Sequence, residues 1–279
     1  HFVTQFRKHK EYQKLRSIIN ILIPTIVRQK LQEGKKNFSE QQNEVTVVMI
    51  ELVDFDKMCQ RYQSRELLEH LEKVYEGLQG FCEQYAVQRI ETVGKTFLAC
   101  GGLKVCEREV DPRLLGNHHS VRVSDFACSA MQFINSITLK DGSKANMTVA
   151  IHTGEAVAGI VGDTKPQFCL IGKAVTVCQK LIAAGNPGDI LMNRKSFSTI
   201  STKVHSLAFE ERRLKLKGST QPQLCYAISK QKGSKQLNPK LRLRPRSTVE
   251  GVNHTVDAPG STAPDEVTAG GKYLAANGN

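Results

Sequence analysis

Apolar residues recur along the chain at two different periods, one typical of helices and one typical of strands. Residues 64–86 carry leucine, valine and aromatic side chains three and four positions apart, which predicts an amphipathic helix. Residues 124–138 repeat that spacing, and so do residues 174–184, where a GNPGD sequence ends the pattern. Residues 2–35 also have helix-like spacing, with a break or kink expected at Pro24.

Runs of β-branched and apolar residues predict the strands. The clearest is VTVVMIELV at residues 45–53. Two such runs flank a Gly-Lys-Thr break centred on Lys95, so a β-hairpin is expected over residues 88–103. The other expected strands are two within 147–162 around Thr153-Gly154, one at 167–172, one around 205–216 and one at 222–228.

The elements alternate in the order β-α-β-β-α-β, followed by further strands and a helix, which predicts an α+β fold with its helices on one face of a sheet. Residues 34–44 indicate a polar linker, and residues 104–123 an irregular polar segment. We expect residues 1–36 to form a basic amphipathic linker helix and residues 45–228 the folded domain. Residues 229–279 are basic and then rich in Gly, Pro, Ser and Thr, which indicates a disordered tail.

The net charge of +12 is concentrated at the two flanks. Residues 1–36 contribute +7 and residues 229–246 another +7, so the remainder of the chain carries −2. A nucleic-acid-binding fold would carry its basic patch on the folded domain, so this distribution argues against one. Basic flanks are typical of attachment near an anionic membrane surface, or of simple solubilisation.

The eight cysteines indicate a reducing compartment, because they form no close CxxC pairs and several lie in apolar runs. No run of about eighteen apolar residues is present to span a bilayer, and no secretory signal is visible. The chain begins with His1 rather than methionine, which suggests a piece of a longer protein. We expect a cytoplasmic location, either free or on the cytosolic face of a membrane-bound parent protein.

Three separated blocks of the sequence resemble one family. They are ILIPTIVRQKLQEG (21–34), IETVGKTFLACGGL (90–103) and IHTGEAVAGIVG with QFCLIG (151–172). The last two, in this order, are similar to the catalytic domain of class III nucleotide cyclases, and this resemblance covers about residues 45–228. The first resembles the helix that commonly precedes such domains. The resemblance to the catalytic domain implies a ferredoxin-like β-α-β-β-α-β core with additional strands and helices and a mostly antiparallel sheet.

The resemblance also implies an activity and a mode of assembly. Two such domains pair head to tail, and each supplies part of a catalytic site at their interface. The ribose 3′-hydroxyl attacks the α-phosphate and releases pyrophosphate, while two carboxylates hold two divalent metal ions. A base-reading pair, an Asn and an Arg near the ribose and transition state, and a Lys on the terminal phosphates complete the family's site.

Both metal-binding positions of the family are altered here. Glu51 stands where the resemblance places the first aspartate, and Lys95 stands in place of the second. Mg²⁺ demands near-ideal octahedral geometry, which the longer glutamate disturbs, and an ammonium group repels the ion. Asp54 is a poor substitute, because on a strand it points to the opposite face from Glu51. We therefore expect this chain to hold no metal pair, with Mg²⁺ or Mn²⁺ supplied by a partner domain's carboxylates.

The two base-reading positions carry Glu91 and Cys169, the combination that the resemblance associates with guanylate cyclases. A carboxylate accepts hydrogen bonds from guanine N1–H and the exocyclic amine, and it rejects the acceptor N1 of adenine. Taken singly, Glu91 would be a solvated hairpin residue and Cys169 a core thiol. Together they predict substrate-binding residues for GTP.

Thr176 and Lys180 stand at the family's Asn and Arg positions. Thr176 can still bond the ribose, whereas Lys180 keeps the charge but lacks the bidentate fork of an arginine. The triphosphate lysine falls within LKLKGST (214–220), where the register gives Ser219 and Lys217 is the nearest cation. Ordinary surface charge is an equal alternative for both lysines.

The leading hypothesis is the metal-free half of a paired guanylate cyclase, heterodimeric or pseudo-heterodimeric. It would convert GTP to cyclic GMP and pyrophosphate in intracellular signalling, and it would be inactive without a second class III cyclase domain. The alternative is a catalytically dead pseudo-cyclase that serves as a regulatory or scaffolding dimerisation module. A structural subunit held through the basic helix and tail is a third.

Overall fold

The computed structural model describes residues 33–34, 38–108, 110, 112–162, 167–204 and 207–229. Glu33 and Gly34 form a turn. The rest of the helix expected over residues 2–35, and the tail expected beyond residue 229, lie outside the described residues.

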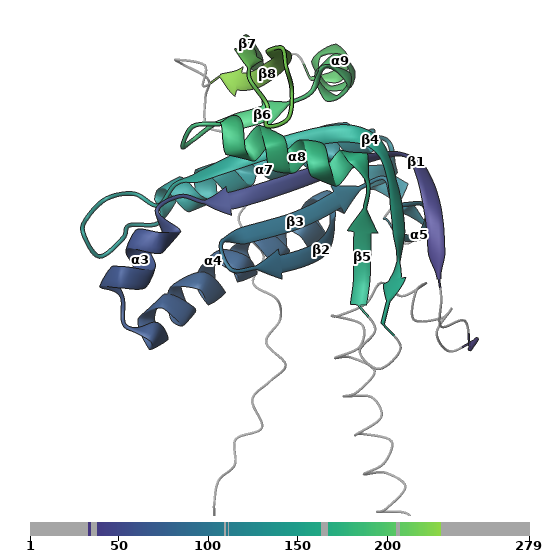
Figure 1. Cartoon of the computed structure of the whole chain (residues 1–279). Helices are drawn as coiled ribbons and strands as arrows, with labels where there is room; N and C mark the ends of the chain where they lie inside the picture. The colour runs from purple at the N-terminus through teal and green to yellow at the C-terminus, as the bar shows by residue number, and fades with distance from the viewer. Residues whose placement is uncertain are drawn as a thin grey trace, which may run out of the picture. The chain divides into compact units, whose positions relative to one another are not determined.

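One sheet organises the described part of the chain (Figure 1). Its strand order is β2-β3-β1-β4-β6-β8-β7, with β5 paired to β4. Every described pair is antiparallel except β4 with β6. The strands are β1 (Ser39–Leu52), β2 (Gln88–Val93), β3 (Thr96–Gly101), β4 (Met147–Val161), β5 (Gln167–Ile171), β6 (Ile190–Met192), β7 (Ala208–Leu214) and β8 (Gln223–Ser229).

The described helices connect these strands and cover the sheet. They are α3 (Phe55–Arg61), α4 (Ser64–Tyr85), α5 (Lys104–Glu107), α6 (Pro112–Leu115), α7 (His119–Ser136), α8 (Lys173–Ala184) and α9 (Arg194–Lys203). The predicted mixed α+β fold with a mostly antiparallel sheet is confirmed. The hairpin, α4 and β5 also lie where their patterns predicted them.

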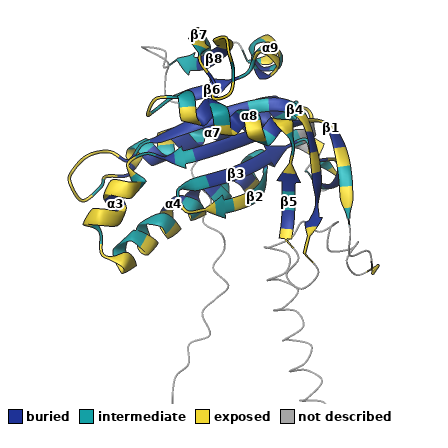
Figure 2. Cartoon of the chain, in the orientation of Figure 1, coloured by how far each residue is buried: buried dark blue, intermediate teal, exposed yellow. Residues whose placement is uncertain are grey.

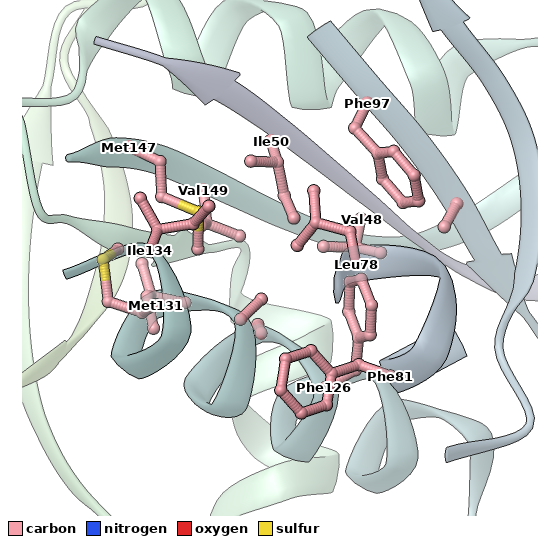
Figure 3. Packing of buried hydrophobic residues seen from close by; sticks show 14 of the residues in the cluster. Val48, Ile50, Leu78, Phe81, Phe97, Phe126, Met131, Ile134, Met147 and Val149 are labelled. Carbon is pink, nitrogen blue, oxygen red and sulfur yellow. The ribbon is translucent and has the colours of Figure 1, made fainter. Parts of the chain in front are cut away.

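The helices lie on both faces of the sheet, which corrects the expectation of a single covered face. Val48 and Ile50 of β1 belong to the cluster that packs against α4 and α7, and Figure 3 shows them pointing toward Leu78 of α4. Val47 and Met49 point the other way, into the cluster that contains α8 residues. A continuous apolar strand buried on both faces needs cover on both, and α8 supplies the second layer.

Residues 147–162 form one long strand rather than the two expected around Thr153-Gly154. β4 pairs with β1 along nearly its whole length, and Gly154 lies opposite Val45, beside a β-bulge between Gln42 and Val45. A glycine inside a strand marks a bulge or a close approach as often as a turn. A Cβ at Gly154 would lie 2.9 Å from Nε2 of His152, so the glycine accommodates that ring.

Strand β1 begins at Ser39, inside the segment expected to be a polar linker. Residues 39–42 pair with residues 156–159 of β4 through the backbone, which does not require apolar side chains. Gln42 is nonetheless buried, and its side-chain oxygen accepts a hydrogen bond from the Lys104 backbone N–H at 3.2 Å.

Helix α7 begins at His119, inside the segment expected to be irregular. His118 caps it, because its Nδ1 accepts a hydrogen bond from the Ser120 backbone N–H at 3.2 Å. The first turns bury Ser120, Arg122 and Ser124, so polar residues on the buried face conceal the helical period. Helices α3, α5 and α6 and strand β6 are too short to give a periodic signal, and α9 carries only two large apolar side chains, Phe197 and Ile200. Figure 2 shows α3 largely exposed and the central strands buried.

Candidate functional site

The hairpin between β2 and β3 brings Lys95 to Glu51. Lys95 Nζ lies 2.9 Å from Glu51 Oε1, with the two side chains 40% and 34% exposed. The hydrogen bond from the ammonium, followed by the carboxylate's charge, raises the pKa of Lys95. The Lys95 backbone is fixed as well, since its carbonyl accepts from the Leu52 N–H at 2.9 Å. The ammonium group of Lys95 therefore pairs with Glu51, the residue that the sequence resemblance aligns with a metal-binding carboxylate.

These residues do not fit a bound divalent metal pair. Glu51 is engaged by an ammonium group. Asp54 leaves the strand in a left-handed conformation at φ 59° and pairs with Lys57 at 2.7 Å. A hard cation needs several free oxygen ligands in regular geometry, and neither carboxylate is free.

Glu91 and Cys169 lie on two strands that are not paired with each other in the sheet. Glu91 is an exposed residue of β2, Cys169 is a half-buried residue of β5, and the two strands are in contact. Burial raises the pKa of the Cys169 thiol, and the negative charge of Glu91 raises it further. The structure thus brings together a carboxylate and a protonated thiol that are far apart in the sequence.

A pocket of about 650 Å³ opens between α8, the start of α9 and the β7–β8 loop. Thr176 and Lys180 both line it, because residues four apart share one face of a helix. Lys180 Nζ reaches the β7–β8 loop, 3.8 Å from where a Cβ on Gly218 would lie. The lining residues are His152, Lys173, Thr176, Val177, Lys180, Asn193, Arg194, Leu216, Gly218, Ser219, Thr220 and Gln223.

The pocket includes Ser219 and leaves out Lys217. Lys217 is exposed and does not line the pocket. The Ser219 hydroxyl donates a hydrogen bond to the Gln221 carbonyl at 2.6 Å, within the β7–β8 loop. Lys180 is the only one of the two predicted lysines that the fold brings to this pocket.

Gly172 joins strand β5 to helix α8. It lies between Cys169 of β5 and Thr176 of α8 and adopts φ 141°. A Cβ there would lie 3.1 Å from Cα of Ala156 on β4. Only glycine adopts this backbone without strain, so it fixes how α8 leaves the sheet.

The sequence analysis missed His152, Asn193 and Arg194. His152 lies on β4, and burial lowers the pKa of its imidazole to about 4, so the ring is neutral at physiological pH. Asn193 caps α9, accepting from the Ser196 N–H at 3.1 Å and from the Ser196 hydroxyl at 2.6 Å. No pattern in the sequence predicted β6 or α9, and those elements place Asn193 and Arg194.

A chain of buried hydroxyl groups holds Asn193 in place. Thr153 Oγ1 lies 2.8 Å from Ser196 Oγ and 2.9 Å from Thr46 Oγ1. Thr46 Oγ1 in turn lies 2.8 Å from Nδ1 of His119. This network links β1, β4, α7 and α9 and ends at Asn193, which lines the pocket. Satisfied buried polar groups of this kind rigidify their surroundings.

Residues 38–230 match the family of adenylate and guanylate cyclase catalytic domains. This chain belongs to that family. The match begins one residue before β1 and ends one residue after β8, so the whole sheet of the cyclase domain lies within it.

Relatives of the cyclase domain include subunits of guanylate cyclases. It is 26% identical over 197 residues to the human guanylate cyclase soluble subunit beta-2, covering 69% of this chain and 30% of that protein. It is 27% identical over 181 residues to the rat guanylate cyclase soluble subunit alpha-1, covering 65% of this chain and 25% of that protein. The chain therefore spans less than a third of the length of these relatives.

Solved structures share the fold. The guanylate cyclase domain of RhGC from Catenaria anguillulae, in complex with GTP, superposes with a TM-score of 0.59 at 21% identity, covering 68% of this chain and 98% of that one. The adenylyl cyclase CyaB from P. aeruginosa also gives a TM-score of 0.59, at 17% identity, covering 72% of this chain and 100% of that one. Among the helices described for this chain, none is long and apolar enough to cross a membrane.

Proposed function

We propose that this cyclase domain is the guanine-recognising, metal-free half of a paired guanylate cyclase. The observation that carries the proposal is the contrast between two sites. Glu91 and Cys169 lie on β2 and β5, which are in contact, whereas Lys95 and Glu51, which the resemblance aligns with the metal carboxylates, form an ion pair. A second cyclase domain would supply the carboxylates that bind Mg²⁺ or Mn²⁺.

Glu91 and Cys169 complement the hydrogen-bonding edge of guanine. The Glu91 carboxylate accepts from N1–H and the exocyclic amine. The raised pKa of Cys169 keeps its thiol protonated at neutral pH, so it donates weakly toward the O6 acceptor. Adenine presents an acceptor at N1 and a donor at its exocyclic amine, so both contacts would fail.

Thr176 and Lys180 would act on the ribose and phosphates. In the reaction the ribose 3′-oxygen bonds to the α-phosphorus and loses its proton, while the bond from that phosphorus to the bridging oxygen breaks and pyrophosphate leaves. The Lys180 ammonium would neutralise charge on the phosphate oxygens in the transition state. The Thr176 hydroxyl, which now donates to the Gly172 carbonyl at 3.3 Å, would turn to the ribose.

The decisive experiment pairs this chain with a cyclase domain that carries both metal aspartates. With Mn²⁺ and GTP, the mixture should make cyclic GMP. The double substitution Glu91→Lys with Cys169→Asp should shift preference from GTP to ATP, whereas Glu83→Lys, on the exposed face of α4, should not. Absence of cyclic GMP with every partner, or an unchanged preference in the double variant, would refute the proposal.

The second candidate is a pseudo-cyclase. Two features favour it: Lys180 stands where the resemblance expects an arginine, and Glu51 is paired with Lys95. Such a module would bind a nucleotide and a second domain without turnover. GTP would then raise the melting temperature of the pair, because a ligand that binds the folded state stabilises it, and no cyclic GMP would form.

We also infer a location where GTP is available, on the cytosolic side, with basic flanks near an anionic lipid surface. The named relatives include soluble subunits and a Dictyostelium discoideum protein called "Guanylyl cyclase, membrane". Co-sedimentation with phosphatidylserine vesicles at low and physiological salt tests the lipid contact. Removal of residues 230–246 should weaken that binding if the basic flank is responsible.

A further inference from the structure

The pocket beside α8 carries positive charge without a compensating acid. Lys173, Lys180 and Arg194 line it, and none of the described lining residues is an aspartate or glutamate. Within the described part of the chain, none of the three forms an ion pair. Burial keeps His152 neutral, so it neither adds to this charge nor offsets it.

Some other basic side chains of the described domain do pair with acids. Lys195, next to Arg194, lies 2.8 Å from Glu44, and Arg212 lies 2.8 Å from Asp189. Three like charges around one concavity repel one another, and they raise the local concentration of anions. An anion in the pocket would convert this repulsion into attraction.

We propose that Arg194 and Lys173 are phosphate-binding residues, which together with Lys180 hold the phosphate chain of a nucleoside triphosphate or the pyrophosphate released from it. This inference rests on the proposed function for the identity of the substrate. Neither residue occupies a position to which the sequence assigned a role. Arg194 supplies the planar, bidentate guanidinium that Lys180 and Ser219 lack.

The structure holds Arg194 at the pocket rim. Its neighbour Asn193 accepts two hydrogen bonds from Ser196, and Ser196 is anchored to Thr153 through the buried hydroxyl chain. The backbone at Arg194 is therefore fixed, while its exposed side chain can reach the ligand. Lys173 lines the same pocket from the first turn of α8.

The test measures binding of inorganic pyrophosphate to the full chain by calorimetry, with a chelator present to exclude metal complexes. Arg194→Gln and Lys173→Gln should each weaken binding by about tenfold or more, the loss expected for one charge-assisted contact. Lys195→Gln removes the same charge one residue away and should change affinity by less than about twofold, because Lys195 faces Glu44. Arg194→Lys should recover only part of the loss.

Two outcomes would overturn the inference. Equal weakening by Arg194→Gln and Lys195→Gln would mean diffuse electrostatic attraction. Unchanged affinity in both pocket variants would place the anion elsewhere. Thermal melts of each variant check that a loss of binding is not a loss of fold.

The pyrophosphate measurement can distinguish failure of this inference from failure of the proposed function. Pyrophosphate has no base, so Glu91→Lys with Cys169→Asp should leave its affinity within about twofold. A normal pyrophosphate pattern without cyclic GMP in any pairing would refute the proposed cyclase activity alone. Cyclic GMP formation that is insensitive to Arg194→Gln, with no change in pyrophosphate affinity, would refute the pocket assignment alone.

Discussion

Lys95 and Glu51 show how one residue changes what a site can hold. The ion pair is partly exposed, at 40% and 34%, so it contributes little to stability. Its main effect is chemical, because the ammonium occupies a carboxylate oxygen that a cation would need. Replacing the Lys95 ammonium with a carboxylate should let this position bind a divalent cation.

Lys95→Asp is expected to create Mn²⁺ binding. The substitution frees Glu51 and adds a second carboxylate near it, and hard divalent cations prefer such oxygen ligands. Titration followed by electron paramagnetic resonance should show affinity at least about tenfold above the parent chain. Lys217→Asp is the control, because Lys217 is exposed and forms no ion pair with any described residue. An equal gain in both variants would show that net charge alone is responsible.

Cys169 allows a test of its proximity to Glu91. Burial and the Glu91 charge raise the pKa of Cys169, which lowers its thiolate fraction at a given pH. Iodoacetamide at pH 8 should therefore modify Cys169 more slowly than the exposed Cys59. Glu91→Gln removes one cause of the raised pKa and should accelerate modification of Cys169, as followed by peptide mass spectrometry.

The matched control for that experiment is Glu83→Gln, which removes a charge from an exposed residue of α4. It should leave the Cys169 rate unchanged. If Glu91→Gln also leaves the rate unchanged, the carboxylate and thiol do not interact, and the base-reading pair loses its support.

At the scale of elements, an ion pair between the buried Arg122 and the half-buried Glu107 ties α5 to α7. Arg122 is 3% exposed, and its guanidinium contacts Glu107 at 2.5 Å and 2.6 Å. It also donates to the Ala86 carbonyl, where α4 ends, at 3.0 Å. One side chain thus joins three helices beside the sheet.

Arg122→Ala should destabilise the domain by about 3–5 kcal/mol, because it leaves Glu107 without its cation and a carbonyl without its donor. Urea unfolding measures the change. Arg65→Ala breaks an exposed pair with Glu69 on α4 and should cost less than about 1 kcal/mol. Similar losses in the two variants would contradict a special role for the Arg122–Glu107 pair.

At the scale of the whole molecule, the proposed function assigns the metal-binding carboxylates to a second domain, because Glu51 is paired with Lys95, so activity should depend on assembly. The chain alone, with Mg²⁺ and GTP, should form no measurable cyclic GMP. Analytical ultracentrifugation in parallel would establish whether it pairs with itself. Robust turnover by this chain alone would mean that Glu51 and Lys95 do not occupy the metal positions.

The sequence by itself determined the family and most of the periodic elements. Helix α4, the β2–β3 hairpin and β5 were predicted because each pattern is set by residues close together in the chain. The separated blocks around Glu91 and Cys169 gave the resemblance that the family match of residues 38–230 confirms.

The tertiary structure alone decided which distant residues meet. Pairing with β1 made residues 147–161 one strand, and burial of β1 on both faces placed α8 opposite α4 and α7. The pairing of β1 with β3 brings Glu51 to Lys95. The short strand β6 and helix α9 bring Arg194 to the pocket. Neither leaves a local pattern, because both depend on contacts between segments far apart along the chain.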